Sequence, residues 1–400
     1  MRSYGDEERR ARLAWRHRLL PGRRTDDLWS VADDVVALHS SDPVTVYLSA
    51  FARMLHPAVE AVSAALYEAR SLVRHHAVRR TLWVATPEVV RVLHAAATLA
   101  LVGPERRRTV GGLAAAGVAE PEAWLDAADA QVLADLYAHG PSTARELGQR
   151  IVALRQPVLL NAGTRWETVL AAHTRVLLGL GFQGRVLRAR PTGSWVNGAY
   201  RYAAADTWLG GGLGALDPAQ ARIALTRRWL TSFGPATAAD LQWWAGWTVA
   251  TTRRALTEVE AVAVDLGGTS GWVAPGDEDT PPAEPWVAAL PSLDPTTMGW
   301  HSRSWYLPEA AADAFDRNGN AGATLWVDFR VVGAWAQSAD GTLRTHYFEP
   351  VGAARRRELD ERLAVLAGAV GATRFSVRFP GRVQARLVGP TGKAPEPDPP

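Results

Sequence analysis

Residues Val35–Leu55 read VVALHSSDPVTVYLSAFARML, in which two apolar helical patterns flank a short polar bend. Apolar residues spaced three or four apart lie on one face of a helix, and this spacing runs through both flanks. The apolar positions are Val31, Val35 and Leu38 before the bend, and Val44, Leu48, Phe51 and Leu55 after it. We therefore predict a helix over Asp27–His39, a turn, and a second helix over Pro43–Leu55.

The bend itself is His39-Ser40-Ser41-Asp42, and it allows two interpretations. Asp42 followed by Pro43 is a strong helix start, because Asp accepts hydrogen bonds from free N–H groups and Pro fits the first turn. Capping alone explains both of these residues. It does not explain why His39 stands three residues before Asp42. A His and a carboxylate in one bend could together hold and activate a single water.

The composition indicates a globular protein of several domains. A chain of 400 residues, 47% apolar and 21% charged, has room for sizeable cores in about two to four domains. No apolar run reaches membrane-spanning length, and acidic residues among the first arginines argue against a secretory signal or transit peptide. Cysteine is absent, which excludes disulfides, thiol catalysis and Cys-ligated zinc. We expect a cytoplasmic monomer without a membrane partner.

The basic residues are almost all Arg, since only Lys393 among the 44 is Lys. A GC-rich genome explains this bias as well as any function does. Arg is nevertheless the better phosphate ligand, because its rigid fork can donate two parallel hydrogen bonds. Residues 1–110 hold 17 Arg against 12 acidic residues. An anionic partner should therefore contact the N-terminal part.

A recurring order of elements predicts three tandem winged helix-turn-helix domains, at residues 1–110, 111–206 and 207–276. The first domain is expected to contain helices over 7–20, 27–39, 43–55 and 57–73, followed by two short strands within Leu72–Thr86. The third is expected to contain three helices within 219–260 and a hairpin made from AVAVDLGGTSGWVAP. This order of helices and then a hairpin is typical of winged helices.

The second domain shows the clearest local signals. A helix begins near Gln131, and Thr143 and Glu146 have the spacing of a capping box before ARELGQRI. Trp166–Leu178 follows as a recognition-type helix. Gly184–Ala203 then predicts a hairpin with Gly, Pro and Asn in its turn.

The acidic, Pro-rich segment Gly276–Pro285 predicts a domain boundary. Beyond it, residues 286–390 are expected to form a small β-rich domain, with strands in ATLWVDFRVVGAWAQ, THYFEPV and RFSVRFPGRVQARLV and one helix at Arg355–Leu366. Residues 391–400 contain almost no apolar side chains and should be disordered. The expected fold class is α+β.

Basic side chains in two wings and one loop are candidates for phosphate contact. The first wing could equally be a solvated edge, whereas Arg188 and Arg190 are two apart and share one strand face. No pair of His residues has metal-ligand spacing, so we predict no metal and no cofactor. The candidate DNA-binding residues are Arg74, His75, Arg79, Arg80, Arg188, Arg190, His301 and Arg303.

Three motifs together resemble the AlkZ/YcaQ family of winged-helix DNA glycosylases. They are ALHSSDPVTVYLSAFAR, LPSLDPTTMGW with the following R-x-WYL, and GNAGATLWVDFRVVGAW, and they occur in the family's order. The resemblance covers about residues 9–390. It implies three winged helices and a C-terminal β-domain arranged as a C-shaped clamp around double-stranded DNA. It also implies a monofunctional glycosylase acting on alkylated purines, including bulky N7-alkylguanine adducts of natural-product genotoxins, as in antibiotic self-resistance.

The family's catalytic motif is Gln-x-Gln, or Gln-x-Asp in some members, and this chain departs from it. The two family positions fall on His39 and Ser41, with Asp42-Pro43 following. Ser41 is a poor substitute for a water-orienting Gln. We therefore expect Asp42 to hold the water and stabilise the sugar cation, with His39 orienting the water.

The alternative is a non-catalytic winged-helix DNA-binding protein, such as a transcriptional regulator. Regulators usually combine one winged helix with a sensor or dimerisation domain. Three expected winged helices without a ligand domain favour the repair enzyme.

Overall fold

The computed structural model describes residues 1–388, and the segment 391–400, for which disorder was predicted, lies outside them. The chain forms two compact units. The first unit contains residues 1–65 and the described part from residue 226 onward, and the second contains residues 66–225. The predicted domain boundaries at residues 110, 206 and 276 stay a prediction, because one compact unit can hold more than one domain.

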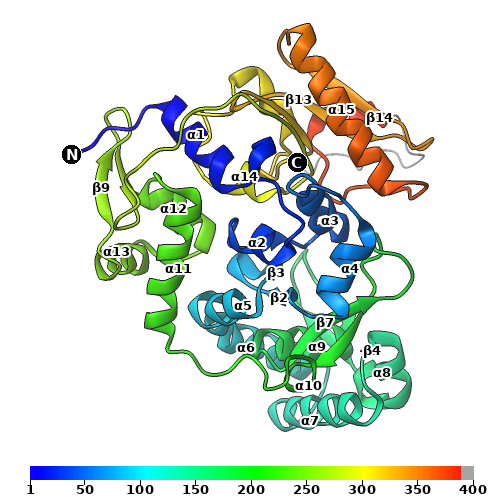
Figure 1. Cartoon of the computed structure of the whole chain (residues 1–400). Coiled ribbons are helices and arrows are strands. Elements are labelled where there is room, and N and C mark those ends of the chain that lie inside the picture. The colour runs from blue at the N-terminus through cyan, green and yellow to red at the C-terminus, as the bar shows by residue number, and fades with distance from the viewer. Residues whose placement is uncertain (389–400) are drawn as a thin grey trace. The chain divides into compact units, whose positions relative to one another are not determined.

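The N-terminal part of the first unit is a series of short helices (Figure 1). Its elements are α1 (Asp6–Arg16), α2 (Leu28–Asp33), the two-residue strand β1 (Leu38–His39), α3 (Pro43–Phe51) and α4 (Val59–Tyr67). The prediction of one helix over Asp27–His39 was wrong at its C-terminal end. Val36 has a φ of 64°, a left-handed conformation that ends a right-handed helix. His39 therefore lies in extended backbone.

The middle of the chain follows the predicted order of three helices and a hairpin. The elements are α11 (Pro218–Phe233), α12 (Ala238–Ala245), α13 (Val249–Glu258), β9 (Val262–Asp265) and β10 (Ser270–Val273). The two strands pair antiparallel. Buried aromatic rings pack α11 against α12, with 6.3 Å between the ring centroids of Trp229 and Trp244 and 6.1 Å between those of Phe233 and Trp244.

The C-terminal part is built on a four-stranded antiparallel sheet in the order β11-β12-β13-β14. Its elements are β11 (Val287–Leu290), α14 (Pro295–Met298), β12 (Thr324–Val327), β13 (Arg330–Gln337), β14 (Leu343–Tyr347), α15 (Ala353–Val370) and α16 (Arg382–Leu387). The helix α15 packs on β11 and on α3. The strand predicted within RFSVRFPGRVQARLV is absent: residues 374–380 are irregular and α16 follows them.

A buried ion pair fixes α3 to the segment after β11. The guanidinium of Arg53, just beyond the end of α3, donates to both carboxylate oxygens of Asp294 at 2.9 and 2.8 Å. Neither side chain is exposed. Burial acts to raise the pKa of Asp294, but the charge and hydrogen bonds of Arg53 keep this pKa below its ordinary value. This pair therefore holds the helix that begins at Asp42 in one position relative to the sheet.

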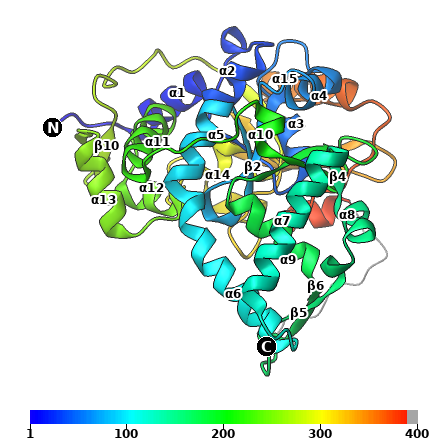
Figure 2. The same ribbon diagram turned by 90° about the horizontal axis from the view of Figure 1, so that it is seen from below.

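The second unit contains several helices and short strands (Figure 2). The strands are β2 (Val73–His76), β3 (Leu82–Ala85), β4 (Ser142–Thr143), β5 (Pro157–Leu160), β6 (Thr168–Ala171), β7 (Val186–Pro191) and β8 (Tyr200–Ala204). The helices are α5 (Pro87–Leu93), α6 (Val102–Ala115), α7 (Pro121–His139), α8 (Ala144–Arg150), α9 (Ala172–Phe182) and α10 (Ala205–Leu209).

The local signals of the second unit were mostly correct. The capping box is confirmed, because the Thr143 side chain accepts from the Glu146 amide while the Glu146 carboxylate accepts from the Thr143 amide. The predicted strands β2, β3, β7 and β8 are present. The recognition-type helix begins at Ala172 rather than Trp166, because residues 168–171 pair with β5 as an unpredicted hairpin. Within residues 1–388, none of the helices has the length and apolar character that crossing a membrane requires.

Candidate active site

The bend His39–Asp42 leads from β1 into α3, and Asp42 caps that helix. The Oδ1 atom of Asp42 accepts a hydrogen bond of 3.3 Å from the backbone amide of Val44. Pro43 occupies the first helical position, as the sequence predicted. The capping interpretation is therefore correct, and it accounts for one of the two carboxylate oxygens.

The second carboxylate oxygen of Asp42 is bound by a distant segment. Its Oδ2 atom accepts a hydrogen bond of 2.8 Å from the backbone amide of Arg378. The Arg378 side chain continues along the bend, where its Nη1 atom donates to the backbone carbonyl of Ser41 at 3.3 Å. Residues 374–380, which we call the strap, thus close over the bend.

Asp42 is a buried carboxylate at 1% exposure. Burial raises its pKa, and the hydrogen bonds from the Arg378 and Val44 amides, together with the Arg378 charge, oppose this rise only in part. Buried carboxylates with a raised pKa are common in catalytic sites. Helix capping alone does not require such burial, and the capping Asp27 of α2 is exposed.

His39 and Ser41 lie in the same bend as Asp42. The Nδ1 atom of His39 accepts a hydrogen bond of 3.3 Å from the Ser41 amide. In that tautomer the ring carries its hydrogen on Nε2, which makes Nε2 a donor. His39 is buried at 4% exposure, whereas Ser41 is half-buried. Ser41 therefore helps to orient the imidazole through its backbone, and its role in catalysis stays a prediction.

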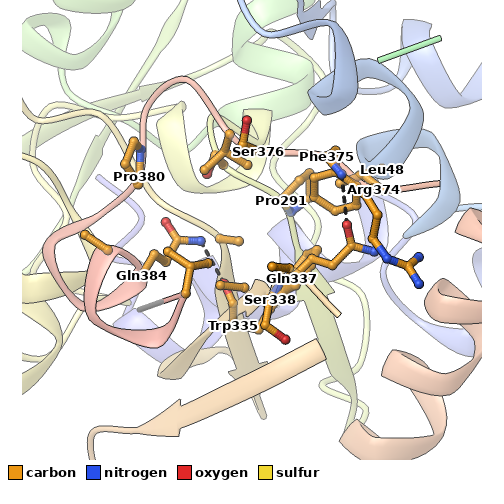
Figure 3. A pocket seen from close by; sticks show the side chains of 17 residues that line it. Leu48, Pro291, Trp335, Gln337, Ser338, Arg374, Phe375, Ser376, Pro380 and Gln384 are labelled. Atoms are coloured by element: carbon orange, nitrogen blue, oxygen red, sulfur yellow. Dashed lines mark hydrogen bonds between the residues drawn. The ribbon is translucent and has the colours of Figure 1, made fainter. Parts of the chain in front are cut away.

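The strap is fixed at both ends by glutamine side chains (Figure 3). Gln337, at the end of β13, accepts from the Phe375 amide at 2.9 Å and donates to the Thr373 carbonyl at 3.2 Å. Gln384, on α16, accepts from the Gly381 amide and donates to the Trp335 carbonyl, both at 2.8 Å. Between these anchors, the strap presents the Arg378 amide to Asp42.

A cavity of about 550 Å³ is lined in part by the strap. Its walls come from β13, the strap, α16, the end of β11 and α3. Most of the side chains that line it are apolar, among them Leu48, Pro291, Trp335, Phe375, Val377 and Val388. Polar side chains occur at Gln337, Ser338, Arg374, Ser376 and Gln384 (Figure 3).

Two of the predicted DNA-contact residues are buried, so the expectation of an exposed wing was wrong for them. The Arg74 guanidinium donates to the Tyr67 hydroxyl at 2.7 Å and lies 4.5 Å from the centre of the Tyr200 ring. His75 shares a hydrogen bond of 3.1 Å with His94. Burial lowers the pKa of His75 well below its ordinary value, so this ring is neutral at physiological pH and offers no charge to a phosphate.

The other candidate DNA-contact arginines of the second unit are more accessible than Arg74. Arg79 and Arg80 both have positive φ in the tight turn between β2 and β3, and Arg80 forms an ion pair with Glu105. On β7, Arg188 stacks on the Tyr202 ring at 4.1 Å. Arg190 pairs with Glu68 at 2.7 Å. Phosphate contact by these four residues stays a prediction.

In the first unit, His301 and Arg303 follow α14. The His301 backbone amide donates to Asp240 at 2.9 Å, and His301 is exposed. The Arg303 guanidinium donates to the Trp300 carbonyl at 3.0 Å and lies 4.6 Å from the centre of the Phe315 ring. Arg303 thus helps to hold its own loop, and its contact with DNA is untested. Across residues 1–388, no three His, Asp or Glu side chains gather in a group that could hold a metal.

Sequence reasoning missed the strap and its anchors. The alternation of Phe375, Val377 and Phe379 predicted a strand, because these apolar residues occur at every second position. In the structure, the amides of Phe375 and Arg378 instead donate to the side chains of Gln337 and Asp42. No local signal in the sequence links Arg378 to a bend so far away in the chain.

The comparisons with known proteins agree with this architecture. The family model described as DNA glycosylase AlkZ-like matches residues 32–369. No curated protein matches the chain by sequence. Among solved structures, the Streptomyces sahachiroi DNA glycosylase AlkZ is similar with a TM-score of 0.69 at 19% identity, covering 94% of this chain and 99% of that one, a likeness of fold. Because the family match spans most of the sequence, the chain belongs to the AlkZ-like family of DNA glycosylases.

Proposed function

We propose that the protein is a monofunctional DNA glycosylase that hydrolyses the N-glycosidic bond of alkylated purines, with Asp42 as its catalytic carboxylate. The family supports a glycosylase acting in DNA repair. The observation that carries the assignment is the buried carboxylate of Asp42, whose pKa burial raises and whose Oδ2 atom meets the strap.

The chemistry suits a site with a single carboxylate. An N7-alkylguanine is already cationic, so the departing base needs no general acid. The enzyme has to stabilise an oxocarbenium-like sugar and to deliver water to its C1′ atom. A carboxylate at 1% exposure interacts strongly with a developing cation, because little water screens the two charges.

Access to Asp42 requires the strap to move, since the Arg378 amide now holds the Oδ2 atom. Once that hydrogen bond opens, Oδ2 can accept from the attacking water. His39, with its Nδ1 atom engaged by the Ser41 amide, would orient this water. Ser41 acts through that amide in this scheme, in place of the family's second motif side chain.

The finer parts of the proposal concern substrate and architecture. Bulky N7-alkylguanines of natural-product genotoxins are the proposed substrates because no aromatic residue stands closer to His39 in the sequence than Tyr47, whereas a pocket for a small flipped base is lined by stacking aromatics. A role in antibiotic self-resistance follows from that substrate class. Three winged helices that hold DNA as a clamp are supported by the repeated order of helices and hairpin, and the clamp stays a prediction.

The alternative proposal is a DNA-binding protein without catalysis. The observation in its favour is that both oxygens of Asp42 already have structural partners. Footprinting separates the two proposals, because a regulator protects a defined palindromic operator and a repair enzyme binds in a damage-dependent way.

The proposed reaction is tested by incubating the protein with duplex DNA that carries one N7-methylguanine. A monofunctional glycosylase leaves an abasic site, so the labelled strand should break only after alkali treatment. Strand breakage without alkali would contradict the monofunctional assignment. An intact strand after alkali would contradict glycosylase activity on this lesion.

A further inference from the structure

The glycosylase scheme gives no role to the cavity beside the strap. The cavity measures about 550 Å³, which lies within the range of pockets that bind small molecules. Its wall is mainly apolar and includes the rings of Trp335 and Phe375. The two glutamines of the wall use their amide groups to hold the backbone, so they do not demand a polar ligand. The other polar side chains at the exposed edge are Ser376 and Arg374, and the Arg374 guanidinium donates to the carbonyls of Asp340, Gly371 and Thr373.

The cavity and the catalytic carboxylate share two structural elements. Phe375 and Val377 of the strap line the cavity, and the next residue, Arg378, donates its amide to Asp42. On the second element, α3, Asp42 caps the first turn while Leu48 faces the cavity. The cavity therefore borders the same strap that covers Asp42.

We propose that this cavity receives the aromatic substituent of an N7-alkylguanine while the modified base lies at Asp42. This inference rests on the proposed glycosylase function and names its substrate class. An aromatic ring would bury apolar surface against Trp335 and Phe375, and polar atoms on its rim would meet Arg374. A methyl adduct is too small to make these contacts, so an aromatic adduct should be excised faster than a methyl adduct.

The first arm of the test measures ligand binding without any reaction. Anilinonaphthalene sulfonate is the probe, because its rings are apolar and its fluorescence rises in an apolar cavity. Ala385 on α16 lines the cavity and is exposed, so Ala385→Phe should place a ring in the cavity without disturbing the core. The matched control is Ala354→Phe on the exposed face of α15. Dye affinity should fall at least about tenfold in Ala385→Phe alone.

The second arm compares excision of N7-benzylguanine and N7-methylguanine from the same duplex. The benzyl-to-methyl ratio of excision rates should fall at least about tenfold in Ala385→Phe and stay at the wild-type value in Ala354→Phe. If Ala385→Phe does not fold, Ala339→Phe fills the cavity from the turn after β13.

An unchanged ratio overturns the proposal, including the case in which dye binding alone is lost, since the cavity then serves a free small molecule. Absence of excision for both lesions contradicts the proposed function instead. The dye arm still decides about the cavity in that case, because equal dye affinity in all variants would exclude an aromatic site there.

Discussion

The backbone amide of Arg378 donates a 2.8 Å hydrogen bond to the carboxylate of Asp42, a residue 336 positions earlier in the chain. This contact joins the strap before α16 to the bend before α3. It also gives the buried carboxylate a partner that can leave, because the strap is irregular backbone held at its two ends by glutamine side chains. The same relationship accounts for both the burial of Asp42 and the route by which a substrate could reach it.

The raised pKa of Asp42 predicts a pH-dependent cost to stability. A carboxyl whose folded-state pKa lies above its ordinary value of 3.8 stabilises the fold below that value. The stabilisation is lost as the pH rises through the folded-state pKa. Asp42→Asn cannot ionise and keeps a helix cap, because Asn is as good a capping residue as Asp. The variant should therefore lack the decline in the free energy of unfolding that the wild type shows over this window.

Urea unfolding of both proteins across the acidic pH range measures this difference. Asp27→Asn is the matched control, since Asp27 caps α2 in the same way but is exposed. Parallel pH profiles for the wild type and Asp42→Asn would show that burial does not raise the pKa of this carboxyl.

Loss of an anchor should release the strap. Gln337→Ala removes the acceptor of the Phe375 amide and the donor to the Thr373 carbonyl. A buried group left without its partner costs about 1–3 kcal/mol, so local opening of the strap should become about 5- to 150-fold more frequent. Hydrogen exchange of the Arg378 amide reports this opening directly. Gln220→Ala, at an exposed position of α11, should leave this exchange rate unchanged, and equal rates in both variants would mean that Gln337 does not anchor the strap.

The ion pair of Arg53 and Asp294 should be sensitive to the loss of either partner. Both side chains are fully buried, so Arg53→Met leaves an uncompensated carboxylate and should lower the free energy of unfolding by about 3–5 kcal/mol. The double variant Arg53→Met/Asp294→Leu removes both charges and should recover most of that loss. Denaturant unfolding of the two single variants and the double variant tests this coupling. Additive losses would show that the two side chains act independently.

The salt dependence of DNA binding tests the predicted phosphate contact of Arg190 on β7. If Arg190 contacts a phosphate, Arg190→Gln should lower the slope of log affinity against log salt concentration by about one unit. Arg344→Gln on β14 changes the net charge equally at an exposed position without a predicted DNA contact, and its slope should match the wild type. Equal slopes for both variants would place Arg190 away from the DNA backbone.

The parts of the fold that the sequence predicted correctly are those with local signals. The Thr143–Glu146 capping box and the Asp42-Pro43 helix start both appear as expected, because caps depend on residues within one turn. The order of α11, α12, α13, β9 and β10 could be predicted for the same reason. Apolar spacing alone was less informative, since it extended a helix to His39 across Val36, where the backbone becomes left-handed.

The candidate site could be predicted only in part. The bend that carries His39, Ser41 and Asp42 was identified from its residue types, and the family resemblance pointed to the same positions. Burial of Arg74 and His75 could not be predicted, because their partners Tyr67, Tyr200 and His94 are brought close by the fold. The strap was missed for a similar reason, since its amides bond to side chains rather than to a neighbouring strand.

Excision of N7-methylguanine by the wild type and Asp42→Asn tests the central claim most directly. The variant keeps the helix cap through its amide oxygen, and it removes the negative charge and the acceptor of the Arg378 amide. Asp27→Asn serves as the control for capping at an unrelated helix. The account predicts abasic sites with the wild type and Asp27→Asn, and a loss of at least about a hundredfold in rate with Asp42→Asn, as expected when a catalytic group is removed. Equal rates for the wild type and Asp42→Asn would show that Asp42 is only a helix cap.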